Sequence, residues 1–271
     1  MTATTNAPEM LELPGLKLQL HRRGNGPPLL FLHPEPGVQF ERPWAAELAA
    51  DFRVIAPSHP GFGTSDLPRW MSRVDDLAYT YLDLMKALDL RVVTVAGVGF
   101  GAWIAAEIAI KSTERIGRLV LANPVGIKIS DRETRDIVDI FVTNQSDVLK
   151  LAYHNPANGA VDASTMTEAD ACMLFRNREA VALFSWSPYM HDPKLKYHLH
   201  RIDVPTLVLW GESDRLASER YGRAFADAIP GARFETIAAA GHFAHLEQPK
   251  VFAERVRVFA AATNTPKGSP S

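Results

Sequence analysis

Two spacings of hydrophobic residues follow one another along the chain and predict its elements. Short apolar or β-branched runs, typical of buried strands, occur at 16–21, 28–32, 53–56, 91–96, 119–122, 205–210 and 233–237. Apolar residues at helical spacing occur between them, at 41–50, 74–88, 100–111, 218–228 and 250–261. This alternation predicts an α/β fold, with a mostly parallel central sheet and helices on both faces.

One segment interrupts the alternation. From about Val125 to His200 the sequence is irregular and mostly helical, with clustered aromatic and histidine residues. We therefore expect a helical cap at 125–200, inserted into an α/β core formed by 12–124 and 201–262. The Thr-, Ser- and Pro-rich ends, 1–11 and 263–271, are expected to be flexible.

Composition narrows the range of partners. The chain has 271 residues, 46% of them hydrophobic and 22% charged, with a formal net charge of −2, as in an ordinary globular protein. This even balance of charge favours a small-molecule substrate over nucleic acid or a membrane, and a homo-oligomer stays open. The first residues lack the basic and apolar regions of a signal peptide, which predicts a cytoplasmic location. The single cysteine, Cys172, excludes an internal disulfide and is expected to be a small buried residue.

Three loops carry the candidate chemistry, each directly after a predicted strand. The first is Gly97-Val98-Gly99-Phe100-Gly101, which has the strand, turn and helix of a G-x-S-x-G nucleophile elbow with glycine in place of serine. The second ends at Asp214 and the third contains His242. Because ligands bind at the carboxyl ends of strands in open α/β sheets, we expect these loops to form one site.

With these motifs in this order, the chain resembles the α/β-hydrolase superfamily from about Leu16 to Ala261, close to capped bacterial esterases and C–C bond (meta-cleavage product) hydrolases. The resemblance implies that Asp214 is the triad acid, His242 the triad base and Gly99 a vacant nucleophile position. It also places the oxyanion loop at His33-Pro34-Glu35. Because Pro34 has no N–H, the implied oxyanion donors are the backbone N–H groups of Glu35 and Phe100.

The roles of the residues near these motifs are less clearly indicated by the sequence. His33 is expected to be a structural hydrogen-bonding residue more than a catalyst, although it is a candidate to line the pocket. The Glu35 carboxylate would oppose the charge that ester hydrolysis develops, so we expect it to face solvent; an inward carboxylate would favour proton transfer or a cationic substrate. Further pocket candidates are Trp186, Tyr189, His191 and Phe243. Most cap aromatic residues are expected to pack the cap itself.

Glycine cannot form an acyl-enzyme, which leaves three hypotheses. In the first, His242 activates water lodged at the vacant position, and a small, partly apolar ester, lactone or C–C substrate is hydrolysed directly. In the second, the His242–Asp214 dyad transfers protons as a lyase or cofactor-free oxygenase. In the third, the protein binds a ligand without catalysis. The presence of both His242 and Asp214 argues against this hypothesis. A natural glycine is favoured over one introduced by design, since such replacements usually use alanine. No cofactor or metal is predicted, because the sequence has no nucleotide fingerprint or metal-ligand spacing.

Overall fold

The computed structural model describes residues 7–162 and 164–262, and within them eight strands form one sheet. The sheet has the order β1-β2-β4-β3-β5-β6-β7-β8, in which β1–β2 and β2–β4 are antiparallel and the other neighbours are parallel. The strands are β1 Glu9–Leu13, β2 Leu16–Arg23, β3 Pro28–Leu32, β4 Arg53–Pro57, β5 Val93–Val98, β6 Ile116–Ala122, β7 Thr206–Gly211 and β8 Arg233–Ile237. The predicted α/β fold is confirmed.

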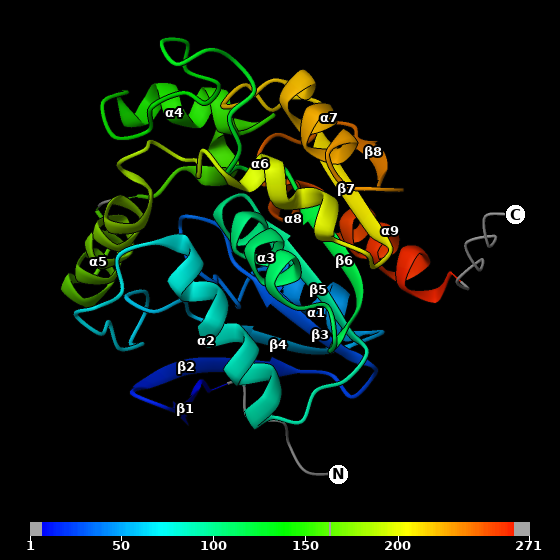
Figure 1. The fold of residues 1–271 in the computed structure, drawn as a ribbon. Coiled ribbons are helices and arrows are strands. Elements are labelled where there is room, and N and C mark those ends of the chain that lie inside the picture. Colours follow the sequence, from blue (N-terminus) through cyan, green and yellow to red (C-terminus); the bar gives the residue numbers. More distant parts are fainter. Residues whose placement is uncertain (1–6, 163, 263–271) are drawn as a thin grey trace, which may run out of the picture.

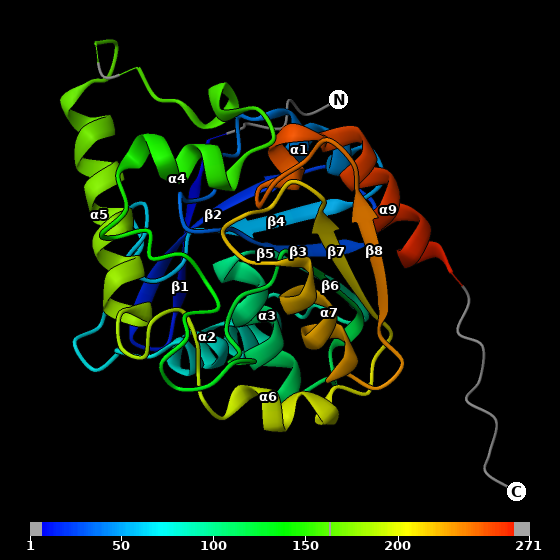
Figure 2. The same ribbon diagram turned by 90° about the horizontal axis from the view of Figure 1, so that it is seen from above.

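Helices cover both faces of the sheet (Figures 1 and 2). On one face lie α1 (Pro43–Ala49), the short α8 (Ala244–Glu247) and α9 (Pro249–Ala261). On the other face lie α2 (Val74–Ala87), α3 (Phe100–Lys111) and α7 (Glu219–Asp227). The central helix α3 buries every residue from Phe100 to Ala109, which explains why its sequence is apolar on all sides.

The chain between β6 and β7 forms the segment expected to be a cap. It contains α4 (Gln145–Ala152), η1 (Pro156–Gly159), α5 (Glu168–Ser185), α6 (Leu195–His198) and η2 (Leu199–Arg201). Thr167 starts α5 with a capping box, in which its hydroxyl accepts from the Asp170 N–H and the Asp170 carboxylate accepts from the Thr167 N–H. Helices α4 and α5 lie to one side of the sheet, near the ends of its central strands (Figure 2).

Two local expectations differ from the structure. Strand β1 occupies Glu9–Leu13, within and just after the segment expected to be flexible, and it pairs along its whole length with β2. Cys172 is exposed on α5, so the expectation of a buried cysteine is wrong. The predicted flexible segment 263–271 and residues 1–6 lie outside the described residues.

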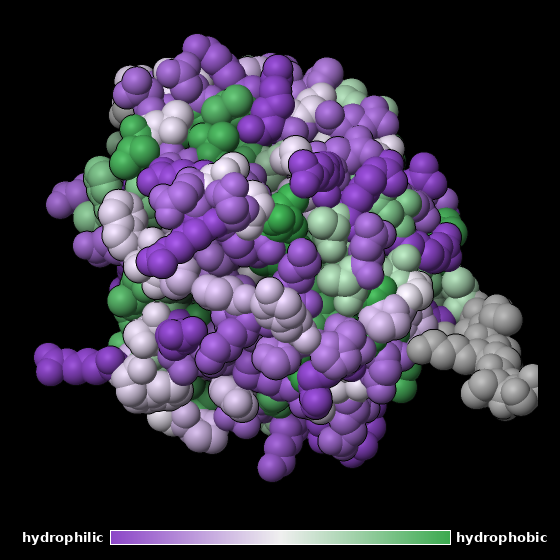
Figure 3. Space-filling model, turned by 45° about the horizontal axis from the view of Figure 1, so that its top comes forward, coloured by the Kyte–Doolittle hydropathy of each residue, from purple (hydrophilic) through white to green (hydrophobic). Residues whose placement is uncertain are grey.

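The face of the molecule seen in Figure 3 is mostly hydrophilic. On this face, hydrophobic residues form small groups between polar ones. Within the described part of the chain, no helix is both long enough and apolar enough to cross a membrane.

Candidate active site

The loops after β3, β5, β7 and β8 meet at the carboxyl edge of the parallel sheet. The β5 loop is a single residue, Gly99, with φ 53° and ψ −117°, and α3 begins directly after it. This conformation is strained for residues with a side chain and is the geometry that a nucleophile elbow requires. A β-carbon on Gly101 would lie 2.1 Å from the Leu32 carbonyl oxygen, so this glycine lets α3 pass close to β3.

Asp214 and His242 form a buried hydrogen-bonded pair. His242 Nδ1 lies 2.8 Å from Asp214 Oδ2, and the two residues are 1% and 7% exposed. The Asn123 amide also donates to Oδ2, at 2.8 Å, and the Leu216 N–H donates to Oδ1, at 2.9 Å. With its acceptors occupied in this way, Asp214 holds the imidazole so that Nε2 faces the site.

The Glu35 side chain occupies the space where a serine side chain at position 99 would lie. A β-carbon built on Gly99 would lie 2.8 Å from Glu35 Oε2 and 2.9 Å from His242 Nε2. The Glu35 side chain is only 10% exposed, so the expectation that it faces solvent is wrong. The carboxylate points inward to the N-terminus of α3, where the Phe100 N–H donates to it and the helix dipole attracts negative charge.

The same carboxylate changes the predicted oxyanion hole. The Phe100 N–H, expected to stabilise an oxyanion, donates to Glu35 Oε1 at 3.1 Å. Glu35 Oε2 is buried and has no hydrogen-bond partner among the described residues. A substrate oxyanion could use the Phe100 donor only after the carboxylate moved, since two negative charges would otherwise share one site.

His242 therefore lies between two carboxylates. Its Nε2 is 3.9 Å from Glu35 Oε1, on the opposite side of the ring from Asp214. Burial alone would lower the pKa of His242, but Asp214 and then Glu35 outweigh this effect and raise the pKa to about 10. At neutral pH the histidine is thus an imidazolium, which has a proton to donate on each ring nitrogen.

His33 supports the loop that carries Glu35. Its Nδ1 donates to the Pro34 carbonyl oxygen at 2.7 Å, and its Nε2 accepts from the His59 N–H at 3.0 Å. His33 is fully buried and stacks on the His59 ring, and burial lowers its pKa to about 3. It is a neutral structural residue that does not line the cavity, so its candidacy for the pocket was wrong.

A cavity of about 790 Å³ opens beside His242 and Glu35. Phe243 lines it as predicted, together with core residues and residues of the segment between β6 and β7. The apolar part of its wall includes Val125, Phe141, Tyr153, Val181, Met190 and Leu216, and the polar part includes Arg42, Asn177 and Arg178. This wall suits a small, partly apolar ligand that carries a few polar groups.

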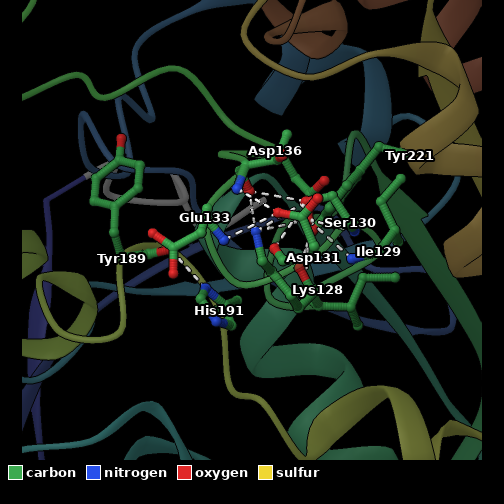
Figure 4. A network of polar contacts seen from close by, with 11 residues as sticks. Lys128, Ile129, Ser130, Asp131, Glu133, Asp136, Tyr189, His191 and Tyr221 are labelled. Atoms are coloured by element: carbon green, nitrogen blue, oxygen red, sulfur yellow. Dashed lines mark hydrogen bonds and ion pairs between the residues drawn. The ribbon is translucent and has the colours of Figure 1, made fainter.

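The other three pocket candidates do not line the cavity. Trp186 is 55% exposed and its ring packs on Phe141. The Tyr189 hydroxyl donates to the Val138 carbonyl oxygen at 2.8 Å, and His191 Nδ1 lies 2.8 Å from the Tyr189 carbonyl oxygen. Figure 4 shows Tyr189 and His191 beside the polar network of residues 128–136. These side chains pack the segment itself, as most cap aromatic residues were expected to do.

Sequence reasoning missed Asn123, which donates to Asp214, whereas Tyr153 was among the cap aromatic residues considered as possible pocket lining. Asn123 comes directly after β6, at the same edge as the other site loops, which was a usable signal. Tyr153 follows α4 and packs its ring on Phe243, a contact that no local pattern indicates. Among residues 7–162 and 164–262, no group of three or more His, Cys, Asp and Glu residues is arranged to hold a metal ion.

The fold and the site loops define a protein of the α/β-hydrolase class. Residues 29–255 match the model of the alpha/beta hydrolase family, and the chain belongs to this family. Asp214, His242 and the elbow at Gly99 all lie within the matched residues.

Two relatives match nearly the whole chain. The 2-hydroxymuconate semialdehyde hydrolase of Pseudomonas sp. (strain CF600) is 27% identical, over 96% of this chain and 97% of its own. The 2-hydroxy-6-oxo-2,4-heptadienoate hydrolase of Pseudomonas putida is 28% identical, over 92% of this chain and 94% of its own. The crystal structure of the enol-lactonase from Burkholderia xenovorans LB400 has a TM-score of 0.75 at 21% identity, over 94% of this chain and all of that one, which shows the common fold.

Proposed function

We propose that this protein is an enzyme that cleaves a small, partly apolar ester, lactone or C–C substrate by acid–base chemistry at His242, without an acyl-enzyme. One observation carries the proposal: the buried His242–Asp214 pair faces a cavity of about 790 Å³ across a glycine elbow. A buried histidine in hydrogen-bond contact with a carboxylate, at the wall of a cavity, is typical of catalytic sites.

The residue at the elbow supports the proposed form of the reaction. Gly99 has no side-chain oxygen to form an acyl-enzyme, so in this proposal water attacks the substrate directly. The size and the mixed wall of the cavity support a small substrate with an apolar body. Two relatives named as hydrolases of small oxo and semialdehyde compounds support hydrolysis of a carbonyl-bearing molecule.

The inward carboxylate favours a second candidate, proton transfer in a lyase or a cofactor-free oxygenase. The negative charge of Glu35 lies in the predicted oxyanion hole, where it opposes the anionic intermediate of ordinary acyl transfer. A reaction that only moves protons between substrate, Glu35 and His242 has no such conflict.

The test measures turnover of a defined panel: short-chain 4-nitrophenyl esters, γ- and δ-lactones, and a vinylogous 1,5-diketone. Native protein is compared with His242→Ala, with Asp214→Asn and with the control His198→Ala, which changes an exposed histidine on α6. We expect His242→Ala to lower kcat/KM by about 10²- to 10⁴-fold, the usual contribution of a general acid or base. The control should match the native protein.

Rapid-quench intact-mass measurement completes the test. During turnover we expect the unmodified chain mass, and fluorophosphonate should not label the native protein. A covalent acyl adduct, or equal turnover by native protein and His242→Ala, would refute the proposal. Exchange of substrate protons with deuterated solvent, without cleavage, would favour the second candidate. Ligand binding with no turnover or exchange would indicate a binding protein.

A further inference from the structure

We propose that the Glu35 carboxylate is a catalytic residue that takes the place of the missing serine, as the proton acceptor that works opposite the His242 proton donor. This inference rests on the proposed function and specifies which groups perform its proton transfers. It concerns the side chain of Glu35, whereas the family resemblance assigns only a backbone N–H to this loop.

Position is the first argument. Glu35 comes from the loop after β3, yet both of its carboxylate oxygens lie within 3.1 Å of the point where a β-carbon at residue 99 would be. The carboxylate thus stands between His242 Nε2 and the Phe100 N–H, the two groups that a serine nucleophile and its oxyanion would contact. The glycine at 99 provides the space that this arrangement needs.

The second argument is an unused acceptor. Glu35 Oε1 accepts from Phe100, but Oε2 is buried with no hydrogen-bond partner among the described residues. Such an oxygen costs free energy unless a ligand pairs with it, on the order of 1 to 3 kcal/mol for an ordinary polar group and more for a charged one. Glu35 lines the cavity, so a turn of its side chain would bring the buried Oε2 to a water molecule or a substrate hydroxyl there.

The third argument is the gap between the two groups. Glu35 Oε1 and His242 Nε2 are 3.9 Å apart, too far for a hydrogen bond. One oxygen atom can, however, lie at hydrogen-bond distance from the carboxylate and the imidazole at the same time. The imidazolium would donate from Nε2, and the carboxylate can only accept, so the pair has the opposite proton roles that a concerted transfer requires.

With Glu35 and His242 in these roles, each proton transferred during hydrolysis has a donor and an acceptor, and no oxyanion hole is needed. Water gives a proton to Glu35 while its oxygen bonds to the carbonyl carbon, and the carbonyl oxygen takes the proton of His242 Nε2. The bond to the leaving group then breaks, and the leaving atom takes the proton from Glu35. One hydroxyl of the intermediate returns its proton to His242, which restores the carbonyl and both catalytic groups. Because His242 neutralises the carbonyl oxygen, the Phe100 N–H can stay on Glu35.

The test uses a probe that needs no knowledge of the substrate. 1,2-Epoxy-3-(4-nitrophenoxy)propane reacts with a carboxylate that has a proton donor beside it: the carboxylate bonds to a ring carbon, the carbon–oxygen bond of the ring breaks, and its oxygen takes the donor proton. We expect a stable ester on Glu35, located by peptide mass spectrometry. Labelling should be at least about 10-fold slower in His242→Ala, where the proton donor is missing.

Glu35→Gln separates catalysis from structure. The glutamine side chain keeps an oxygen that can accept from Phe100, so a purely structural role survives, whereas the base is lost. On any panel substrate that the native protein turns over, we expect kcat/KM to fall about 10²- to 10⁴-fold in Glu35→Gln. Glu114→Gln, at an exposed glutamate, is the matched control. Glu35→Asp is the second variant and should also be slow, because the shorter side chain withdraws the carboxylate from His242.

The outcomes distinguish this inference from the proposed function. If turnover requires His242 but Glu35→Gln is as active as the native protein and Glu35 is not labelled, the inference is overturned and the proposed function stands. If Glu35 is labelled in a His242-dependent way and no panel substrate reacts, Glu35 is the reactive carboxylate and the proposed substrate class is wrong. Labelling at other carboxylates alone overturns the inference.

Discussion

The charge relation between Glu35 and His242 can be measured directly with Glu35→Gln. The variant removes one negative charge 3.9 Å from His242 Nε2. With an effective dielectric constant of about 20, two unit charges at that distance interact by about 4 kcal/mol, or about 3 pKa units. The pKa of His242, raised to about 10 in the native protein, should therefore fall toward about 7 in the variant, with Asp214 still in place.

The assay is an NMR titration of imidazole resonances with labelled histidine, in which His242→Ala identifies the relevant signal among the nine histidines. Because the folded-state pKa lies above the unfolded value, the proton on His242 stabilises the fold fully below about pH 6.5, and this contribution disappears as pH rises through about 10. In Glu35→Gln the loss should occur about 3 pH units earlier. A pKa of His242 that is the same in native protein and variant would refute the view that the Glu35 side chain faces the ring.

Three further results are expected. Gly99→Ser alone should not be labelled by fluorophosphonate, because its β-carbon would lie 2.8 Å from Glu35 Oε2. Gly99→Ser combined with Glu35→Gly should be labelled. Equal labelling of the two variants would contradict the position of the Glu35 side chain. Burial lowers the pKa of His33 and His245 to about 3, so both stay neutral in the fold while the unfolded chain binds protons below about pH 6.5. The free energy of unfolding in urea should then fall by up to about 1.4 kcal/mol per pH unit for each histidine as pH drops from 6.5 to 5, and His245→Phe should flatten the slope. Glu247 accepts hydrogen bonds from N–H groups of the His242 loop and of residues 154–158. Glu247→Ala should therefore lower the free energy of unfolding by about 3 kcal/mol, measured by thermal or urea unfolding. An unchanged midpoint would show that these hydrogen bonds do not stabilise the fold.

The sequence was sufficient to predict which loops form the site, but not to predict where their side chains point. Strand order alone placed Asp214 and His242 at one edge of the sheet, because parallel strands bring the loops at their carboxyl ends together. The direction of the Glu35 side chain depends on loop torsions and on the charge of its surroundings, neither of which has a periodic signal. Strand β1 was missed because Glu9–Leu13 is a short run near the N-terminus in which charged and apolar residues do not alternate regularly.

The directions of the cap aromatic side chains could not be predicted from the sequence either. Trp186, Tyr189 and His191 are of the right type to line a pocket, but their helix and loop turn them toward neighbours within the same segment. Residue type therefore located the segment beside the cavity, and only three-dimensional packing selected Phe141 and Tyr153 as its lining.

The contact between residues 35 and 99 also constrains how this chain can change. A serine introduced at Gly99 while Glu35 remained would place its β-carbon against a buried carboxylate, so this substitution alone would be strained. Replacement of Glu35 first removes the obstacle and leaves a glycine that tolerates the turn. The order of the two substitutions therefore matters: a serine at residue 99 is accommodated after Glu35 is replaced and obstructed before.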